Sequence, residues 1–260
     1  MLLAIDIGNT TIALGVFNGE SLVKEWRARS EREKTADEYG ILLLDLLRLS
    51  GLEPSAIDGV IISSVVPPLT PAFQELSRRL FGRRALVVGP GLKTGLPILY
   101  ENPGEVGADR VVASVAAFEK YGGPCVVVDF GTATTFDAVT AKGEYLGGAI
   151  APGIRISAEA LYLRTAKLPQ IEVVKPERAI GKTTVASMQS GIYFGYVGLV
   201  NHLIGEIRGE LGGRAEVVVT GGFGAQLGPE IRGGHHLEPH LVLHGLRLIF
   251  DLNAGDKAGE

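Results

Sequence analysis

Two stretches, "DIGNTTIALGVFNGESLVKEW" at residues 6–26 and "DFGTATTFDAVTAKGEYLGGA" at residues 129–149, follow one plan. Each opens with an aspartate, an apolar residue and a glycine, followed by a polar cluster rich in threonine. Each continues as an alternating apolar run, a turn containing glycine and a second alternating run, which is the pattern of a β-hairpin. The aspartates are 129 − 6 = 123 residues apart. This similarity indicates two copies of one structural unit.

The elements predicted around the hairpins have a similar order in both halves of the chain. In the first half we expect strands at 2–7, 11–17, 21–28, 58–66 and 85–88, and helices at 36–51, 70–81 and 105–121. In the second half we expect strands at 125–131, 133–140, 144–150 and 215–222, and helices at 153–165, 184–211, 223–232 and 240–252. The sequence therefore predicts an α/β protein of two similar domains, residues 1–115 and 116–260, packed tightly with a cleft between them.

The composition is that of an ordinary globular protein, with 260 residues, 46% hydrophobic and 21% charged. The formal charge is −4 and no basic run occurs, which argues against nucleic acid as a partner. The single cysteine, Cys125, excludes an internal disulfide and fits a reduced, cytoplasmic setting. No apolar run has membrane-spanning length, and we interpret the apolar N-terminus as a strand rather than a signal peptide.

The polar cluster that opens each hairpin suits phosphate binding. Glycine lets the backbone approach an anion, hydroxyl and N–H groups donate to it, and the carboxylate can hold a cation that bridges to it. For either loop alone, an Asp-Gly turn that only reverses the chain is the alternative. Because matching positions of two repeats carry the cluster, we interpret the loops after Asp6 and Asp129 as a pair of phosphate-binding loops.

The stretch "ENPGEVGADRVVA" brings Gly107, Asp109 and Arg110 together at the start of a predicted helix. Asp109 could accept a proton from an alcohol, and Arg110 could bind a carboxylate or phosphate through its planar fork of donors. A surface ion pair is the alternative for these two neighbours.

Two other patterns carry weaker signals. "AIGKTTV" resembles the end of a nucleotide P-loop, but Pro176 stands where that motif needs glycine, so we expect Thr183 to cap the next helix instead. The spacing of His236, His240 and His244 suggests one face of a helix and a possible metal site. No acidic or cysteine partner completes a ligand set, so solvated or packed histidines are the favoured interpretation.

Seven segments carry a resemblance to a known family. They are "DIGNTTIALGVF", "IISSVVPPL", "TGLPILYENPGEVGADR", "VVVDFGTATTFDAV", "GGAIAPGI", "GKTTVASMQSGIYFGY" and "VVVTGG", in this order within residues 2–222. In these segments the chain resembles the type III pantothenate kinases of the acetate kinase–sugar kinase–Hsp70–actin superfamily. The resemblance implies two duplicated ribonuclease H-like domains with an ATP cleft between them, each supplying one phosphate loop.

The resemblance also implies roles for residues at matching positions. The first ATP loop comprises Asp6, Ile7, Gly8, Asn9, Thr10, Thr11, Ile12 and Ala13, and Thr132 lies in the second loop. Pantothenate contacts fall on Tyr100, Gly107, Ala108, Asp109, Arg110 and Thr184. Asp109 would be the proton acceptor, Asp6 the carboxylate on the Mg²⁺ side, and Asp129 the ligand of a monovalent cation, K⁺ or NH₄⁺.

The implied activity is ATP-dependent phosphorylation of pantothenate to 4'-phosphopantothenate, the first step of coenzyme A synthesis, by a cytoplasmic homodimer. Two alternatives stay open: a superfamily kinase for another small hydroxy compound, and a non-catalytic regulatory relative. One departure concerns the nucleoside end of the site, because Phe223 follows "VVVTGG" where the family usually has an acidic residue. Phe223 could stack on adenine or pack beneath its loop.

Overall fold

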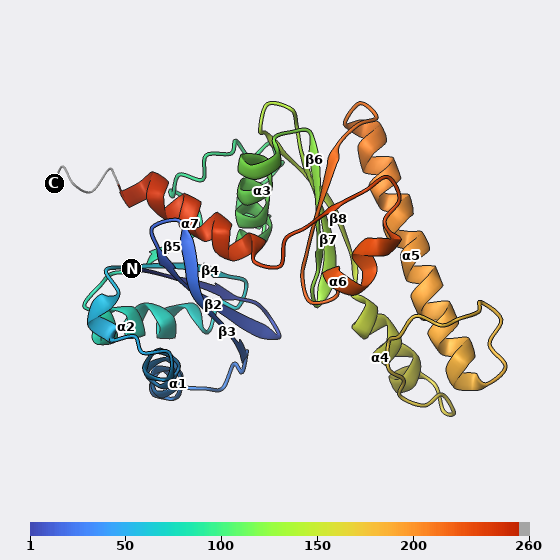
Figure 1. Ribbon diagram of the computed structural model, residues 1–260, viewed down its shortest axis with the longest axis horizontal. Helices are drawn as coiled ribbons and strands as arrows, with labels where there is room; N and C mark the ends of the chain where they lie inside the picture. Colours follow the sequence, from blue (N-terminus) through green and yellow to red (C-terminus); the bar gives the residue numbers. More distant parts are fainter. Residues whose placement is uncertain (255–260) are drawn as a thin grey trace. The chain divides into compact units, whose positions relative to one another are not determined.

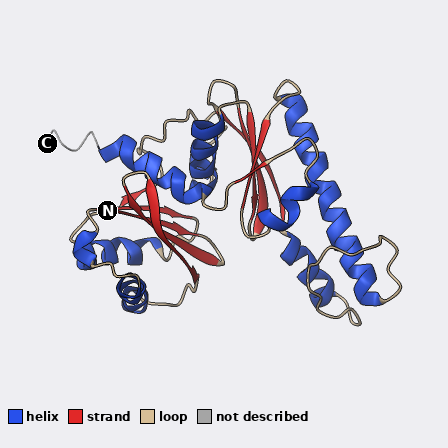
Figure 2. Ribbon diagram, viewed as in Figure 1, coloured by secondary structure: helices blue, strands red, loops and turns tan. Residues whose placement is uncertain are grey.

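The structure, a computed structural model, describes residues 1–254 of the chain (Figures 1 and 2). Its contacts divide the chain into two compact units. One unit is Met1–Ala116 together with the segment that begins at His240, and the other is Ala117–Pro239. No helix among the described residues is long and apolar enough to cross a membrane.

The first unit contains a five-stranded sheet in the order β3-β2-β1-β4-β5. Its strands are β1 (Leu2–Ile7), β2 (Thr11–Asn18), β3 (Ser21–Arg29), β4 (Gly59–Ser64) and β5 (Leu86–Val87). The first three strands form an antiparallel meander, whereas β4 and β5 continue the sheet parallel to β1. The β2–β3 turn at Asn18-Gly19, with Gly19 at φ +57°, is the predicted hairpin turn.

The second unit contains a five-stranded sheet in the order β10-β9-β6-β7-β8. Its strands are β6 (Cys125–Phe130), β7 (Ala133–Val139), β8 (Tyr145–Pro152), β9 (Glu216–Thr220) and β10 (His236–Leu237). Strand β6 pairs antiparallel with β7 and parallel with β9, as β1 pairs with β2 and β4. Strand by strand the two sheets have the same connectivity, so the predicted α/β duplication is confirmed.

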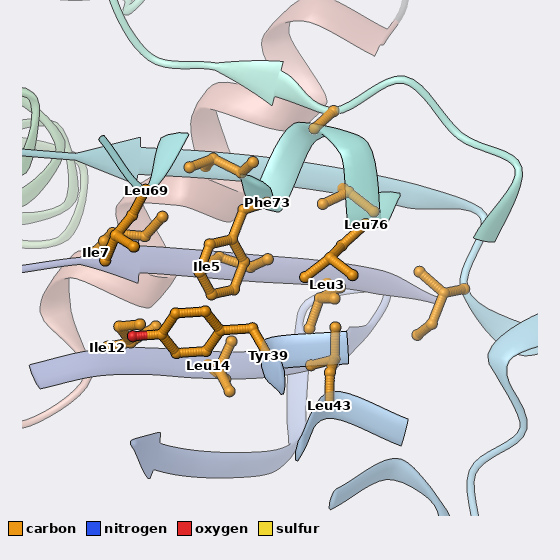
Figure 3. Close-up of a cluster of buried hydrophobic side chains, with 14 of the residues drawn as sticks. Leu3, Ile5, Ile7, Ile12, Leu14, Tyr39, Leu43, Leu69, Phe73 and Leu76 are labelled. Carbon is orange, nitrogen blue, oxygen red and sulfur yellow. The ribbon is translucent and has the colours of Figure 1, made fainter. Parts of the chain in front are cut away.

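The core of the first unit lies between the sheet and two helices, α1 (Ala36–Leu49) and α2 (Thr70–Phe81). Figure 3 shows apolar side chains of β1 and β2 facing those of the two helices. Each fully buried Leu, Ile or Phe contributes roughly 1.5–3 kcal/mol to folding. Helix α1 begins at a capping box, since Thr35 Oγ1 accepts from the Glu38 N–H and the Glu38 carboxylate accepts from the Thr35 N–H.

The C-terminal helix α7 (Leu241–Ala254) also belongs to the first unit and contacts β1, β2 and β4. Glycines make this close packing possible. A Cβ atom on Gly59 would lie 2.4 Å from the ring of Phe250, and one on Gly245 would lie 2.1 Å from the Val112 carbonyl oxygen of α3 (Ala108–Tyr121). The division of the chain thus differs from the expected boundary, which placed residues 240–260 in the second domain.

The core of the second unit lies between its sheet and the long helix α5 (Thr184–Glu210). Tyr193, Tyr196, Val200 and Ile204 recur at helical spacing on α5 and are buried against β6 and β9. Two shorter helices complete the unit, α4 (Ile154–Arg164) and α6 (Gly224–Leu227).

The histidine pattern near the C-terminus does not form the metal site that its spacing suggested. His236 lies in β10, where it is 2.8 Å from Glu216, and His240 precedes α7, where it is 2.6 Å from Glu25. His244 lies within α7 with its ring edge against Phe17. Among residues 1–254 no group of three or more His, Cys, Asp or Glu side chains could hold a metal ion.

The contact between α7 and α3 yields a test with a matched control. Gly245→Ala should destabilise the protein by about 1–3 kcal/mol, because the new methyl group overlaps the Val112 carbonyl. Gly205 lies on the exposed face of α5 with open space around it, so Gly205→Ala should stabilise the protein by about 0.5–1 kcal/mol. Urea unfolding measures the change in the free energy of unfolding for each variant. Equal changes in the two variants would show that α7 does not pack on α3 as described.

Candidate phosphate-binding and catalytic site

The first predicted phosphate loop connects β1 to β2. Asp6 is the penultimate residue of β1, and the exposed Asn9, Thr10 and Thr11 follow it. The Gly8 N–H donates to the Thr11 carbonyl at 3.0 Å, which closes a tight turn. A carboxylate at the base of a turn with exposed hydroxyl and amide groups can serve a phosphate and its cation. The predicted residues Asp6 to Ala13 therefore lie together in one loop.

The second predicted phosphate loop connects β6 to β7, and two glycines approach it closely. Asp129 pairs with Thr135 on β7 and Thr220 on β9. A Cβ atom on Gly221, which has φ +88°, would lie 2.3 Å from Asp129 Oδ1, and one on Gly153 would lie 2.3 Å from the Thr132 carbonyl oxygen. Only glycine allows these approaches, so the ends of β8 and β9 hold the second loop in place.

Asp109 and Arg110 open helix α3, as predicted. The Arg110 N–H donates to Asp109 Oδ1 at 2.8 Å, and the Arg110 side chain is 8% exposed. A Cβ atom on Gly107 would lie 2.6 Å from Asp109 Oδ1, so glycine is required for this orientation of the carboxylate. The surface ion pair considered for these neighbours does not fit an arginine that is buried.

The environment of Asp109 favours its protonated form. Burial raises the pKa of the Asp109 carboxyl, and the hydrogen bond from the Arg110 N–H and the charge of Arg110 oppose that rise only in part. A pKa above the ordinary value of about 3.9 brings a carboxylate closer to the range of an effective general base. The raised pKa thus makes the Asp109 carboxylate a better proton acceptor than an ordinary aspartate.

Two predicted substrate residues lie apart in the sequence from the Gly107–Arg110 group. Tyr100 is exposed in the loop before α3, and Asn102 and Glu105 order the end of this loop by a 2.8 Å hydrogen bond. Thr184 is the first residue of α5 in the second unit. The preceding Thr183 caps α5 by accepting from the Ala186 N–H at 3.1 Å, which confirms the capping interpretation of "AIGKTTV".

Phe223 follows β9 beside the second loop and lines a cavity of about 390 Å³. Its backbone N–H points to the Phe130 carbonyl at 3.5 Å, and its ring centroid lies 5.6 Å from the Arg155 guanidinium carbon. The ring is partly buried against the core of the second unit. The cavity is lined by Arg155, Ala158, Glu159, Gln170, Ile171, Glu172, Val173, Phe223 and Gln226. Phe223 therefore both packs under its loop and borders an open space.

Sequence reasoning missed the supporting residues of the two loops. Gly153 and Gly221 occur in the segments "GGAIAPGI" and "VVVTGG", but their steric role appears only when the strand ends are brought together. Arg155 and its cavity had no signal, because a lone arginine in a helix is common on protein surfaces.

The arrangement of the strands agrees with solved structures of a broader class. A Baf-family transcriptional activator from Campylobacter jejuni aligns with a TM-score of 0.58 and 17% identity over 97% of this chain and 99% of that chain. An inorganic polyphosphate/ATP-glucomannokinase from Arthrobacter sp. strain KM aligns with a TM-score of 0.51 and 15% identity over 96% of this chain and 98% of that chain. The fold is the two-domain α/β fold of the actin-like ATPases and sugar kinases.

Sequence comparison is more specific. The profile of the type III pantothenate kinases matches residues 2–206. The type III pantothenate kinase of Moorella thermoacetica (strain ATCC 39073 / JCM 9320) is 54% identical over 97% of this chain and 100% of that protein. The type III pantothenate kinase of Geobacter sulfurreducens (strain ATCC 51573 / DSM 12127 / PCA) is 53% identical over 97% of this chain and 99% of that protein. The chain belongs to the type III pantothenate kinase family.

The packing around Asp129 predicts a position where a single methyl group strongly lowers activity. Gly221→Ala would place its Cβ against the Asp129 carboxylate and the Phe130 backbone, so we expect a loss of kcat of at least about 10²-fold. Gly213→Ala is the control, since Gly213 has a similar φ of +90° but open space around it. Steady-state kinetics should show little change for Gly213→Ala, and an active Gly221→Ala variant would contradict the described packing.

The environment of Asp109 predicts opposite effects on activity and stability. Asp109→Asn should lower kcat by about 10²–10⁴-fold, because the amide cannot accept the proton. Because burial raises the folded-state pKa, ionised Asp109 destabilises the protein as pH rises through that pKa. The variant should therefore gain stability relative to wild type at pH 8 and lose that gain towards pH 4, as urea unfolding at the two pH values would measure. Near-normal turnover would remove Asp109 from the mechanism.

Proposed function

We propose that this chain transfers the γ-phosphoryl group of ATP to the primary hydroxyl of pantothenate, giving 4'-phosphopantothenate for coenzyme A synthesis. The observation that carries the proposal is the duplicated strand-end loop, Asp6 to Ala13 in one unit and Asp129 to Thr132 in the other. The first unit also contains the buried Arg110 next to Asp109 at the start of α3. Membership of the type III pantothenate kinase family supplies the substrate.

Phosphoryl transfer depends mainly on positioning and on neutralising charge. We assign phosphate binding to the N–H and hydroxyl groups of the two loops, one from each unit. Asp109 orients the hydroxyl of pantothenate and accepts its proton while the new O–P bond forms. The bond between the γ-phosphorus and the bridging oxygen of ADP breaks, and ADP leaves with that electron pair.

The remaining residues bind and orient the acceptor. Arg110 presents a buried guanidinium whose fork matches a carboxylate, which pantothenate carries at its polar end. Tyr100 and Thr184 supply a ring and hydroxyl groups that can contact the rest of pantothenate. The cavity beside Phe223 would receive the nucleoside end of ATP.

The loop residues fit the two cations that we propose. Asp6 is a partly exposed carboxylate next to exposed hydroxyls, which suits Mg²⁺ that completes its shell with phosphate oxygens and water. Asp129 lies in a loop whose Gly131 and Thr132 carbonyl oxygens gather near Gly153, a set of oxygen donors suited to K⁺ or NH₄⁺. When bound, these ions would neutralise charge on the triphosphate.

We further propose a cytoplasmic homodimer. The second unit exposes large apolar side chains on its edge strand β8 and on α4, including Leu146, Ile150 and Leu163. An exposed edge with apolar residues is typically covered by a partner.

A coupled assay of ADP release tests this function. With ATP and Mg²⁺, turnover should require pantothenate among a panel of small alcohols and hydroxy acids. At constant ionic strength turnover should rise with K⁺ or NH₄⁺ and hardly with Na⁺, because Na⁺ is too small to contact all the oxygen donors proposed around Asp129. Asp129→Asn should abolish the K⁺ response as well as lower the rate.

Three outcomes would contradict parts of the proposal. Turnover of another compound with none of pantothenate would indicate a different superfamily kinase. ATP binding without turnover of any acceptor in K⁺ and Mg²⁺ would indicate a regulatory protein. A K⁺ response retained by Asp129→Asn would place the monovalent cation elsewhere.

A further inference from the structure

The first phosphate loop has no positive charge of its own. Between Met1 and Val23 the sequence contains no lysine or arginine. The loop offers only neutral donors, the N–H groups and hydroxyls near Asn9, Thr10 and Thr11, above the acidic Asp6. A cationic side chain from another segment would add to the charge compensation that the proposed Mg²⁺ supplies, because the loop itself offers a triphosphate only neutral donors.

The connection from β3 to α1 brings such a side chain to the loop. Arg32 Nη2 donates to Asn9 Oδ1 at 3.1 Å, although the two residues are 23 positions apart in the sequence. Thr11 pairs with Arg29 at the end of β3, and the Ser30 N–H donates to the Thr10 carbonyl at 3.0 Å. The segment that carries Arg32 therefore lies directly against the phosphate loop.

A buried tyrosine holds this segment in position. The Tyr39 hydroxyl accepts from the Glu31 N–H at 2.9 Å and donates to the Glu31 carbonyl at 3.0 Å. Tyr39 is 2% exposed, and Figure 3 shows its hydroxyl directed toward Ile12, which borders the loop. The backbone of the residue before Arg32 is thus tied to a core side chain, while the Arg32 side chain itself is exposed.

The charge of Arg32 is not used by an acidic neighbour. Glu31 is engaged with Lys34 at 2.9 Å, and within residues 1–254 Arg32 has no ion pair. Its one hydrogen bond is to a neutral amide oxygen. An exposed guanidinium that binds only a neutral group is available to exchange that contact for an anion.

We propose that Arg32 binds the triphosphate of ATP at the first loop, exchanging its hydrogen bond with Asn9 for two N–H donors to phosphate oxygens. The inference rests on the proposed function, because it assumes that the loop binds ATP. Arg32 supplies the positive charge that the loop lacks, and its planar fork fits two oxygens of one phosphate.

The effect of Arg32 should be confined to the nucleotide. Arg32→Ala should raise the Kd for ATP with Mg²⁺ by about tenfold, as measured by calorimetry, which is the usual scale for a charged hydrogen bond. The KM for pantothenate should stay within about twofold. Arg32→Lys should retain part of the affinity, because it keeps the charge and loses the fork. The difference between wild type and Arg32→Ala should shrink as ionic strength rises.

Arg48→Ala is the matched control, since Arg48 is an exposed arginine in the last turn of α1. Its ATP affinity should equal that of wild type. Arg32→Ala with wild-type ATP affinity would overturn the inference, and so would equal weakening of ATP and pantothenate. If the wild-type protein binds ATP but does not phosphorylate pantothenate, the proposed function fails, whereas the comparison of ATP affinities still decides the role of Arg32.

Discussion

The contact between Gly221 and Asp129 is the constraint on which the second half of the site depends. A Cβ atom at Gly221 would lie 2.3 Å from the carboxylate and 2.6 Å from the Phe130 backbone, so the end of β9 can meet the end of β6 only without a side chain. This approach fixes the orientation of the carboxylate and leaves the Gly131–Thr132 turn exposed. Gly107 does the same for Asp109 in the first unit, where its Cβ would lie 2.6 Å from Oδ1. A carboxylate that packs against backbone has a fixed orientation, so it is pre-organised to bind a cation or to accept a proton.

Duplication explains why the chain has two such loops, and the surroundings of the two copies differ in ways that bear on the tasks we propose for them. In the first unit the loop after β1 is open, with three exposed polar residues and a neighbouring arginine from the β3–α1 connection. In the second unit the glycines that follow β8 and β9 approach the loop after β6 closely, while its Gly131 and Thr132 are exposed. Exposed residues in both loops suit a phosphate that must be exchanged in each turnover, and the carbonyl oxygens near Gly153 would suit the proposed monovalent cation. The residues that we propose for the acceptor side, Asp109 and Arg110, lie in the first turn of α3 in the first unit.

Much of the fold could be predicted from the sequence, because turn and capping residues mark the ends of the same elements that the spacing of apolar residues predicts. The hairpin turn at Asn18-Gly19 and the capping box of Thr35 and Glu38 mark element ends by their own chemistry. The equally short strands β5 and β10 differ in their surroundings: β5 lies in the apolar run "ALVV" and was predicted, whereas β10 lies in the polar stretch "GGHHLEPH" and was missed. Helix α7 was predicted, but its amphipathic pattern says only that one face is buried and not which sheet buries it. The clustering of Asp109 with Gly107 was visible in sequence, whereas the contacts of Gly221 with Asp129 and of Arg32 with Asn9 join residues far apart in the chain.

A crystal structure with a non-hydrolysable ATP analogue, Mg²⁺, K⁺ and pantothenate tests the central claim most directly. We expect phosphate oxygens within hydrogen-bond distance of N–H groups of the loop after β1 and of the loop after β6. The primary hydroxyl of pantothenate should lie within about 3.2 Å of an Asp109 carboxylate oxygen. Phosphates held away from either loop, or a hydroxyl directed to a group other than Asp109, would contradict the account that the duplicated strand-end loops and the α3 carboxylate form one phosphoryl-transfer site.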